Sequence, residues 1–150
     1  MDNVSKVNIK EGQIKQYLSW KEAEKDCELL AEKIKKYCQE KYKIKNPDYI
    51  YGISRGGLPL ATILSHMLDV KMIHSRDSID KEDAIVCIVD DISDSGDTLE
   101  KKVDKYYHCD KVKDIVSVTW MIKEDTSYKP NLFEIVVDKK IWVCFPWEKK

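Results

Sequence analysis

The segment from Ile88 to Lys101, IVDDISDSGDTLEK, carries four aspartates within eight positions. It overlaps the end of an apolar run, AIVCIV, at residues 84–89. Like charges at this density repel one another and resist burial, so the segment needs a partner that neutralises them. A carboxylate pair such as Asp90 and Asp91 can hold a divalent cation, or accept hydrogen bonds from two neighbouring hydroxyls of a sugar. The first half of the segment therefore indicates a site for a cation, a sugar or both.

The second half of the segment combines hydroxyl side chains with a glycine at the start of a predicted helix. It consists of Asp94, Ser95, Gly96, Asp97 and Thr98. A turn of this composition presents successive backbone N–H groups and two hydroxyls at a helix N-terminus, which suits a phosphate monoester. The whole segment thus predicts a site for a phosphorylated sugar.

Three other interpretations explain this segment less well. An EF-hand loop with Gly96 at its sixth position would place Lys102 at the twelfth, where calcium requires a bidentate glutamate. A Walker B strand would fit the apolar run and the aspartate pair, but the chain has no Gly-x-x-x-x-Gly-Lys-[Ser/Thr] segment. A helix cap alone would use only one or two of these residues. Sugar and phosphate binding account for more of them.

A second loop with the composition of an anion site follows the β-prone run DYIYGI at residues 48–53. It consists of Ser54, Arg55, Gly56 and Gly57. Paired glycines let backbone N–H groups approach a ligand closely, a helix N-terminus favours an anion, and Arg55 adds a fork of donors. A tight strand-to-helix turn with a solvated arginine would have the same sequence, so this loop alone leaves both interpretations open.

Helices and strands alternate along the rest of the chain. Ser19 and Glu22 form a predicted capping box before a helix over residues 20–40, whose apolar residues repeat every three or four positions. Two further helices are expected, one from Pro59 to Leu68 and one over residues 97–107. The expected strands cover residues 48–53, 70–73, 84–89, 114–120, 133–137 and 141–145, and residues 1–18 look irregular. This alternation predicts an α/β fold with a mostly parallel sheet flanked by helices.

The bulk composition narrows the class of protein. With 150 residues, 43% of them hydrophobic and 35% charged, the chain is expected to form a single domain over residues 1–150. A net charge of −1 gives no argument for a nucleic-acid or membrane partner. Because we find neither an apolar run of membrane-spanning length nor a signal-peptide pattern, a cytoplasmic protein is expected. The five cysteines include no Cys-x-x-Cys pair, and Cys27 and Cys87 fall inside apolar patterns, so reduced core thiols are expected. The three histidines have no metal-ligand spacing.

Three segments together resemble one known family. Val89–Thr98 is similar to the phosphoribosyl pyrophosphate signature of type I phosphoribosyltransferases, and Ile53–Gly57 resembles their pyrophosphate loop. The segment Trp142–Glu148, WVCFPWE, resembles the closing segment of the branch that acts on xanthine, guanine and hypoxanthine. The similarity runs from the helix at Trp20 to Glu148. The chain therefore resembles a type I phosphoribosyltransferase of the purine branch.

The resemblance implies roles for the two loops. Asp90 and Asp91 would hold the 2′ and 3′ hydroxyls of the ribose, partly through Mg²⁺. The segment 94–98 would bind the 5′-phosphate, and the loop 54–57 would bind pyrophosphate, with a non-proline cis peptide between Ser54 and Arg55. Asp94 would face purine N7 and act as general base or acid. The expected catalytic residues are therefore Asp90, Asp91 and Asp94.

The resemblance also implies a purine site near the C-terminus. Lys123 would contact the 6-oxo group, Trp142 would stack on the base, and the backbone of Val143 would read its edge. Without the resemblance, Lys123 would be interpreted simply as a solvated lysine in a loop. Trp142 and Trp147 could likewise be packing aromatics.

The implied activity is Mg²⁺-dependent transfer of phosphoribose from phosphoribosyl pyrophosphate to N9 of guanine, xanthine or hypoxanthine, giving the purine mononucleotide and pyrophosphate. Because the family commonly forms dimers or tetramers, a homo-oligomer is expected. The hood, a segment that closes over the sugar in this family, is much shortened, because only Lys71–Asp83 separates Val70 from Ala84. Two alternatives stay open: a regulatory module that binds a nucleotide or the activated sugar, and transfer to another base.

Overall fold

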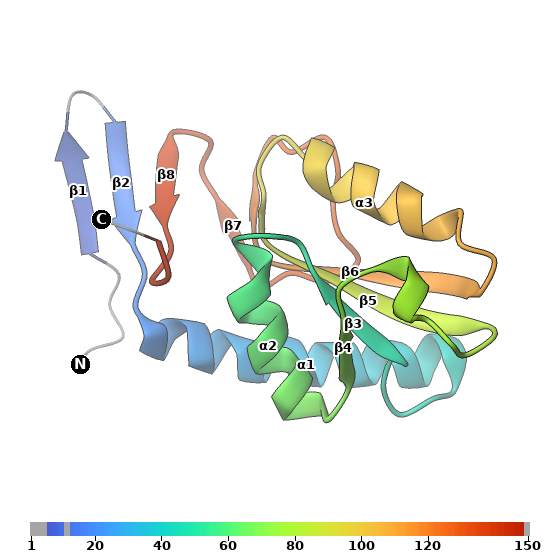
Figure 1. Ribbon diagram of the computed structural model, residues 1–150. Helices are drawn as coiled ribbons and strands as arrows, with labels where there is room; N and C mark the ends of the chain where they lie inside the picture. The colour runs from blue at the N-terminus through green and yellow to red at the C-terminus, as the bar shows by residue number, and fades with distance from the viewer. Residues whose placement is uncertain (1–5, 11–12, 149–150) are drawn as a thin grey trace.

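A five-stranded parallel sheet forms the centre of the computed structural model, which describes residues 6–10 and 13–148 (Figure 1). Its strand order is β4-β3-β5-β6-β7. The strands are β3 (Tyr49–Gly52), β4 (Lys71–Ile73), β5 (Ala84–Ser93), β6 (Val112–Lys123) and β7 (Ile135–Val137). The α-helices are α1 (Trp20–Tyr42), α2 (Gly57–Leu68) and α3 (Asp97–Tyr107). The predicted α/β fold is confirmed.

The helices cover both faces of this sheet, with α1 and α2 on one face and α3 on the other (Figure 1). In β5, Ile85, Cys87 and Val89 pack in the core beside α1 and α2. Val86 and Ile88 pack instead in the core beside α3. Both faces of this strand are buried, which explains why its sequence is continuously apolar rather than alternating.

Local signals set the start of α1. The Glu22 N–H donates to Ser19 Oγ at 3.0 Å, and the Ser19 hydroxyl donates to the Glu22 carboxylate at 3.2 Å, so the predicted capping box is confirmed. One stripe of the helix is buried, comprising Ala23, Cys27, Leu30, Ala31, Ile34 and Cys38. Lys43, in the left-handed conformation, ends the helix. In the part of the chain that the structure describes, no helix combines the length and apolar character needed to cross a membrane.

A second sheet of three strands lies where the two ends of the chain meet (Figure 1). β1 (Lys6–Lys10) pairs antiparallel with β2 (Gln13–Tyr17), and β2 pairs parallel with β8 (Ile141–Cys144). The expectation that residues 1–18 are irregular is therefore wrong for both strands, and residues 1–5 and 11–12 lie outside the described residues. Because the second neighbour of β2 comes from the far end of the chain, no local pattern indicates this pairing.

Strand β5 is longer than the apolar run that predicted it. Pairing continues beyond Val89, because Asp90 lies opposite Thr119 of β6 and Ile92 lies opposite Met121. The expectation that the strand ends before the aspartate pair is therefore wrong, since Asp90 and Asp91 belong to the strand. Backbone pairing with β6 extends the strand into polar sequence and holds the backbone of both aspartates in place.

The five cysteines are all free thiols. Cys27, Cys38 and Cys87 are buried, whereas Cys109 and Cys144 are partly exposed. Burial raises the pKa of the Cys27 thiol to about 12, so this thiol stays protonated at neutral pH. The prediction that Cys27 and Cys87 belong to the core is confirmed.

Candidate active site

The carboxyl ends of β3, β5 and β6 meet at one edge of the sheet, where α/β proteins generally bind ligands. The loop 54–57 follows β3, the acidic segment ends β5 and begins α3, and Lys123 is the last residue of β6. The second sheet contributes Trp142 and Val143 from β8. Residues that are far apart in the sequence thus surround three cavities at this edge.

The first cavity, which we call the phosphate cavity, has a volume of about 80 Å³ and lies at the N-terminus of α3. It is lined by Asp90, Ile92, Ser93, Asp94, Ser95, Gly96, Thr98 and Leu99. Gly96 has a φ of +96°, and a Cβ there would come within 2.6 Å of the Tyr128 nitrogen, so only glycine fits this turn. The helix N-terminus and the hydroxyls of Ser95 and Thr98 suit a phosphate group. Asp97 is exposed and does not line the cavity.

The turn after β6 supports this phosphate-binding segment from behind. The Ser127 N–H donates to the Ser95 carbonyl at 3.0 Å. The Ser93 hydroxyl donates to the Tyr128 carbonyl at 2.7 Å, and it lies 3.0 Å from the Thr126 hydroxyl. Sequence analysis missed this turn because its hydrogen bonds join distant parts of the chain. Its only local signal is a Thr-Ser-Tyr run shortly after a predicted strand.

Asp90 and Asp91 line different cavities. Asp90, which is 8% exposed, lines the phosphate cavity, and Asp91 lines the two further cavities described below. Asp90 accepts the Asp91 N–H at 2.9 Å, and Asp91 accepts the Ile92 N–H at 2.7 Å. Burial, followed by the charge of Asp91, raises the pKa of Asp90, and burial also raises the pKa of Asp91. The described residues provide no cationic partner for either carboxylate, so the pair favours a ligand that brings positive charge or hydroxyl donors.

The loop after β3 packs directly on Asp91. Its peptide bond between Ser54 and Arg55 is cis, as predicted. Gly56 lies so close to the Asp91 carboxylate that a Cβ on residue 56 would overlap it. Ser54 is exposed, and Gly57 is the first residue of α2. The loop and the acidic segment therefore form one site.

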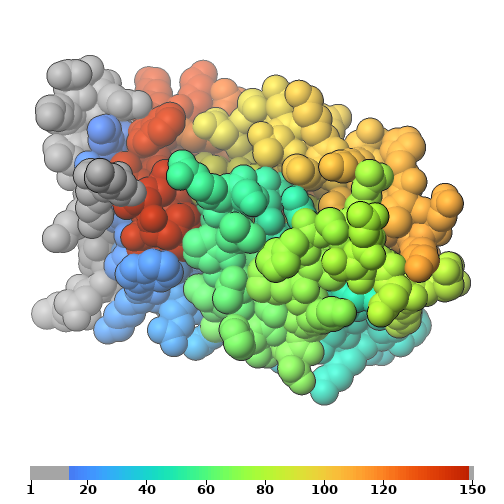
Figure 2. Space-filling model, viewed as in Figure 1, coloured from blue at the N-terminus to red at the C-terminus, as the bar shows by residue number. Residues whose placement is uncertain are grey.

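The largest of the three cavities, which we call the loop cavity, has a volume of about 620 Å³. It is lined by Arg55, Gly56, Asp91, Trp147 and Glu148. Figure 2 shows the teal-green region that follows β3 beside the red C-terminal region on one face of the molecule. Arg55 is exposed and lines a cavity that Asp91 also lines, so the arginine is solvated and also stands where an anion in this cavity would meet it.

The third cavity, which we call the base cavity, has a volume of about 120 Å³. It is lined by Asp91, Ile92, Asp94, Lys123, Trp142, Val143, Phe145 and Glu148. Lys123 is 5% exposed, and its ammonium donates to the carbonyls of Ile141 and Lys139, so the alternative of a solvated lysine is wrong. Trp142 is 51% exposed and lines the same cavity.

Trp147 has a different role from Trp142. Its ring stacks on Phe145 with the centroids 5.2 Å apart, and it also lies beside Trp120 and Trp20. Trp147 therefore holds the C-terminal segment against the core. The packing alternative that was open for both tryptophans describes Trp147.

Glu148 is a site residue that sequence analysis missed. Its carboxylate accepts the Phe145 N–H at 2.7 Å, and it lines both the base cavity and the loop cavity. Its negative charge adds to burial in raising the pKa of Asp91. The signal was present as the acidic residue that ends the segment WVCFPWE.

Asp94 lines both the phosphate cavity and the base cavity. It is exposed, and it lies between the end of β5 and the start of α3. A ligand that fills both cavities must therefore pass Asp94. The described residues contain no group of three or more His, Cys, Asp or Glu side chains that could hold a metal ion by itself.

Comparisons with solved structures agree with this architecture. A purine phosphoribosyltransferase from Pyrococcus horikoshii matches with a TM-score of 0.76 and 32% identity, over 91% of this chain and 95% of that chain. The xanthine-guanine-hypoxanthine phosphoribosyltransferase of Helicobacter pylori matches with a TM-score of 0.73 and 24% identity, over 89% and 93% of the two chains. A hypothetical protein from Neisseria gonorrhoeae with bound ppGpp matches with a TM-score of 0.76 and 18% identity, over 90% and 89%. No family model and no curated protein sequence matches the chain.

The parallel sheet, together with the acidic segment at the carboxyl end of its central strand, is the fold of the type I phosphoribosyltransferases. The Helicobacter and Neisseria proteins share this fold at identities below 25%, whereas the Pyrococcus enzyme is 32% identical over most of both chains. The chain belongs to the purine phosphoribosyltransferases and is an enzyme of that class. The predicted family and branch are confirmed.

Proposed function

We propose that the enzyme transfers phosphoribose from phosphoribosyl pyrophosphate to N9 of a 6-oxopurine (guanine, xanthine or hypoxanthine) and releases the mononucleotide and pyrophosphate. The observation that carries this proposal is that the phosphate cavity and the base cavity meet at Asp94. A nucleotide with its 5′-phosphate at the N-terminus of α3 and its base beside Trp142 would span these two cavities. The loop cavity, beside Arg55, would then receive the pyrophosphate.

The aspartate pair suits the sugar in both its ground state and its reacting state. Departure of pyrophosphate leaves positive charge on the sugar ring, and nearby carboxylates stabilise that charge. Asp90 and Asp91 are also acceptors for the 2′ and 3′ hydroxyls. Because burial raises the pKa of both groups, hydroxyl donors that favour the ionised form would strengthen their role.

Mg²⁺ is the cofactor that we propose, and the available donors fit it. This ion is commonly held by one or two carboxylates while substrate oxygens and water complete its coordination, so a cluster of three protein ligands is not required. Asp90 and Asp91 would supply the carboxylates. The ion would neutralise charge on the pyrophosphate as it leaves.

The residues around the base cavity suit a 6-oxopurine. An ammonium can only donate hydrogen bonds, so Lys123 would donate to a 6-oxo group and would discriminate against a 6-amino group, which is itself a donor. Its bonds to the Ile141 and Lys139 carbonyls hold the ammonium at the end of β6. The exposed ring of Trp142 would stack on the base, and the backbone of Val143 would read its edge. Stacking of this kind contributes about 1–3 kcal/mol.

Asp94 is the residue that we propose for proton transfer at the base. It lines the base cavity and the phosphate cavity, so it would face the purine beside the bond that forms at N9. Its carboxylate would accept a hydrogen bond from a protonated N7, or take the proton as the base becomes part of the nucleotide. Among the described residues, Asp94 is the one carboxylate that lines both of these cavities.

A nucleotide-binding module with little turnover is the second candidate function. The observation that favours it is the short segment 74–83 between β4 and β5, because a longer hood would exclude water from the reacting sugar. The neisserial protein of the same fold was crystallised with ppGpp, so this fold is compatible with binding a nucleotide of that kind. Both candidates use the same phosphate and base cavities.

Turnover separates the two candidates. The protein is incubated with phosphoribosyl pyrophosphate, Mg²⁺ and each oxopurine in turn, and mononucleotide formation is followed. We expect product, with loss of activity in Asp94→Asn and normal activity in Asp104→Asn, a matched change at an exposed position of α3. Tight nucleotide binding without product would support the module, and equal activity of the two variants would refute the role of Asp94.

A further inference from the structure

A fourth cavity, with a volume of about 280 Å³, lies between the segment after β4 and the outer part of α3. Residues 74–77 form one wall, Lys102, Lys105 and Tyr106 of α3 form another, and Tyr51 of β3 completes it. Figure 2 shows the lime-green segment after β4 beside the gold-to-orange region that contains the end of α3. Within the described residues, none of the side chains that line this cavity lines any of the three cavities of the active site.

The walls of this cavity carry an excess of positive charge. Arg76, Lys102 and Lys105 contribute three cations, His74 adds an imidazole, and Asp77 is the one carboxylate among the lining residues. Across the part of the chain that the structure describes, none of these three cations forms an ion pair. Converging, unpaired cations favour an anionic ligand.

Two of these cations are held in place by neutral groups. The Arg76 guanidinium donates to the backbone carbonyl of Lys105 at 3.3 Å, which joins the two walls. The Lys102 ammonium lies 5.8 Å from the centroid of the Tyr51 ring. Neither contact neutralises the positive charge, so both cations stay available to a ligand.

Tyr106 gives an independent indication of a ligand. The residue is 2% exposed, and its buried hydroxyl has no hydrogen-bond partner among the described residues. Burial raises the pKa of Tyr106, so its phenol remains a donor. A buried donor without an acceptor is unfavourable, so a small rearrangement that uncovers this hydroxyl would let an oxygen of a bound anion accept from it.

We propose that this cavity is a second anion site that binds a chain of two or more phosphoryl groups, separate from the substrate site. Its volume of about 280 Å³ exceeds the 80 Å³ of the phosphate cavity. Three cations on two separate elements match an anion with several charges better than a monophosphate. Such an anion would bridge Arg76 to Lys102 and Lys105, and so tie the short hood to the helix whose N-terminus forms the phosphate cavity.

Site-resolved binding tests this proposal. Tripolyphosphate, and separately cytidine triphosphate, is titrated into the ¹⁵N-labelled full chain without divalent cations, and backbone amide shifts are followed. We expect saturable shifts in residues 74–78 and 102–106, whether or not residues 54–57 also respond. The two probes distinguish a free polyphosphate from a nucleotide, because tighter binding of cytidine triphosphate would show that the nucleoside also contributes.

Variants of α3 make the test specific. Changing both Lys102 and Lys105 to Glu should weaken the binding that shifts residues 74–78 by about a hundredfold, since two charge-assisted contacts are lost. Lys101→Glu, an exposed change on the same helix outside the cavity, should leave it unchanged. Tyr106→Phe removes only the unpartnered hydroxyl, keeps the ring, and should weaken binding about tenfold.

The outcomes are independent of the proposed catalytic function. If shifts occur only in residues 54–57 and 94–98, or if Lys101→Glu weakens binding as much as the double change, the second site does not exist. If the double variant does not fold, Tyr106→Phe decides, and unchanged binding in that variant overturns the proposal. A chain that makes no nucleotide but still shows the shifts at 74–78 would refute the transferase proposal and retain this one.

Discussion

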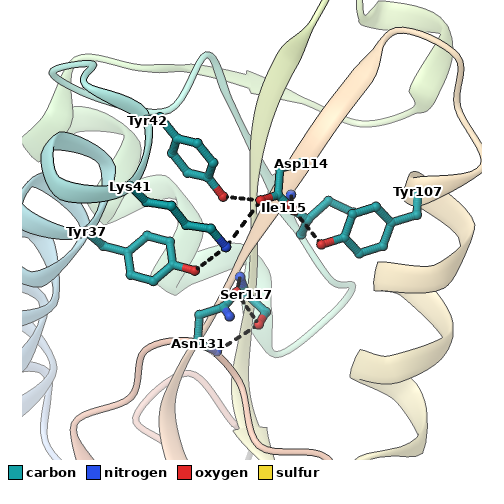
Figure 3. Close-up of polar contacts among 8 residues, drawn as sticks. All are labelled: Tyr37, Lys41, Tyr42, Tyr107, Asp114, Ile115, Ser117 and Asn131. Atoms are coloured by element: carbon teal, nitrogen blue, oxygen red, sulfur yellow. Dashed lines mark hydrogen bonds and ion pairs between the residues drawn. The ribbon is translucent and has the colours of Figure 1, made fainter.

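Asp114 and Asp90 lie on neighbouring strands of one sheet but at its opposite ends, and their surroundings differ. Asp114 is at the edge where the strands begin, the amino edge, and Asp90 is at the edge where they end, the carboxyl edge. Asp114, near the start of β6, accepts the hydroxyls of Tyr42 and Tyr107, each at 2.6 Å, and the Ile115 N–H at 2.8 Å (Figure 3). The Lys41 ammonium lies 3.4 Å away. Although burial alone would raise the pKa of Asp114, these donors and this charge lower it.

Asp90, near the end of β5, receives little such support. It accepts one backbone N–H and lies beside a second carboxylate, so burial and Asp91 raise its pKa. The comparison teaches that the amino edge of the sheet uses its carboxylate to bind α1, α3 and β6 together. At the carboxyl edge, the carboxylates of Asp90 and Asp91 have no cationic partner among the described residues. Their negative charge therefore destabilises the ligand-free protein and favours binding of a ligand.

The largest difference should appear in activity. We expect Asp90→Asn to lower kcat/KM by about 10²- to 10³-fold, because the sugar loses a fixed negative charge in the transition state. Asp114→Asn, the same change at the other edge, should stay within about threefold at a temperature where both variants are folded. Steady-state kinetics with phosphoribosyl pyrophosphate and an oxopurine measure both. Similar losses in the two variants would contradict the division between the edges.

The two ends of β6 allow a second comparison. Lys123→Met should raise KM for the oxopurine by about 10- to 100-fold, since a hydrogen bond from a charged donor is lost, with less than about a threefold change in KM for the activated sugar. Lys113→Met, at the exposed amino end of the same strand, is the matched control and should alter neither constant. If both constants rise equally in Lys123→Met, Lys123 does not recognise the base specifically.

Stability should show the opposite order. Asp114→Asn should lower the free energy of unfolding by about 1–3 kcal/mol at pH 7, because hydrogen bonds to a charged acceptor are lost. A folded-state pKa below the unfolded one means that this stabilisation is present above the unfolded pKa, about 3.9, and disappears as the pH falls through the lowered value. Urea unfolding at pH 7 and at acidic pH measures it. Asp104→Asn, on the exposed side of α3, should have no effect.

The sequence predicted one of these edges much better than the other. The acidic segment and the loop 54–57 are each local, so residue types and spacing were enough to predict them as candidate binding segments, and Lys123 was predicted through the family resemblance. Asp114 could be read only as the start of a strand, because its partners Tyr42 and Tyr107 come from the ends of two different helices. The pairing of β2 with β8, the supporting turn at 126–128 and the role of Glu148 depend on similar long-range contacts. Patterns within one segment do not report such contacts.

The smallest predicted effect tests the comparison most directly, because the change in the free energy of unfolding should have the opposite sign at Asp90 and at Asp114. Asp90→Asn should raise the free energy of unfolding of the ligand-free protein by about 1–2 kcal/mol near pH 8, although the same change lowers activity. A folded-state pKa above the unfolded one means that ionised Asp90 destabilises the fold increasingly as the pH rises from the unfolded pKa towards the folded one. The gain in the variant should therefore shrink towards zero as the pH approaches about 4. If Asp90→Asn instead destabilises the protein at pH 8, as Asp114→Asn is expected to do, then Asp90 stabilises the fold. The two edges would then not differ in the way proposed.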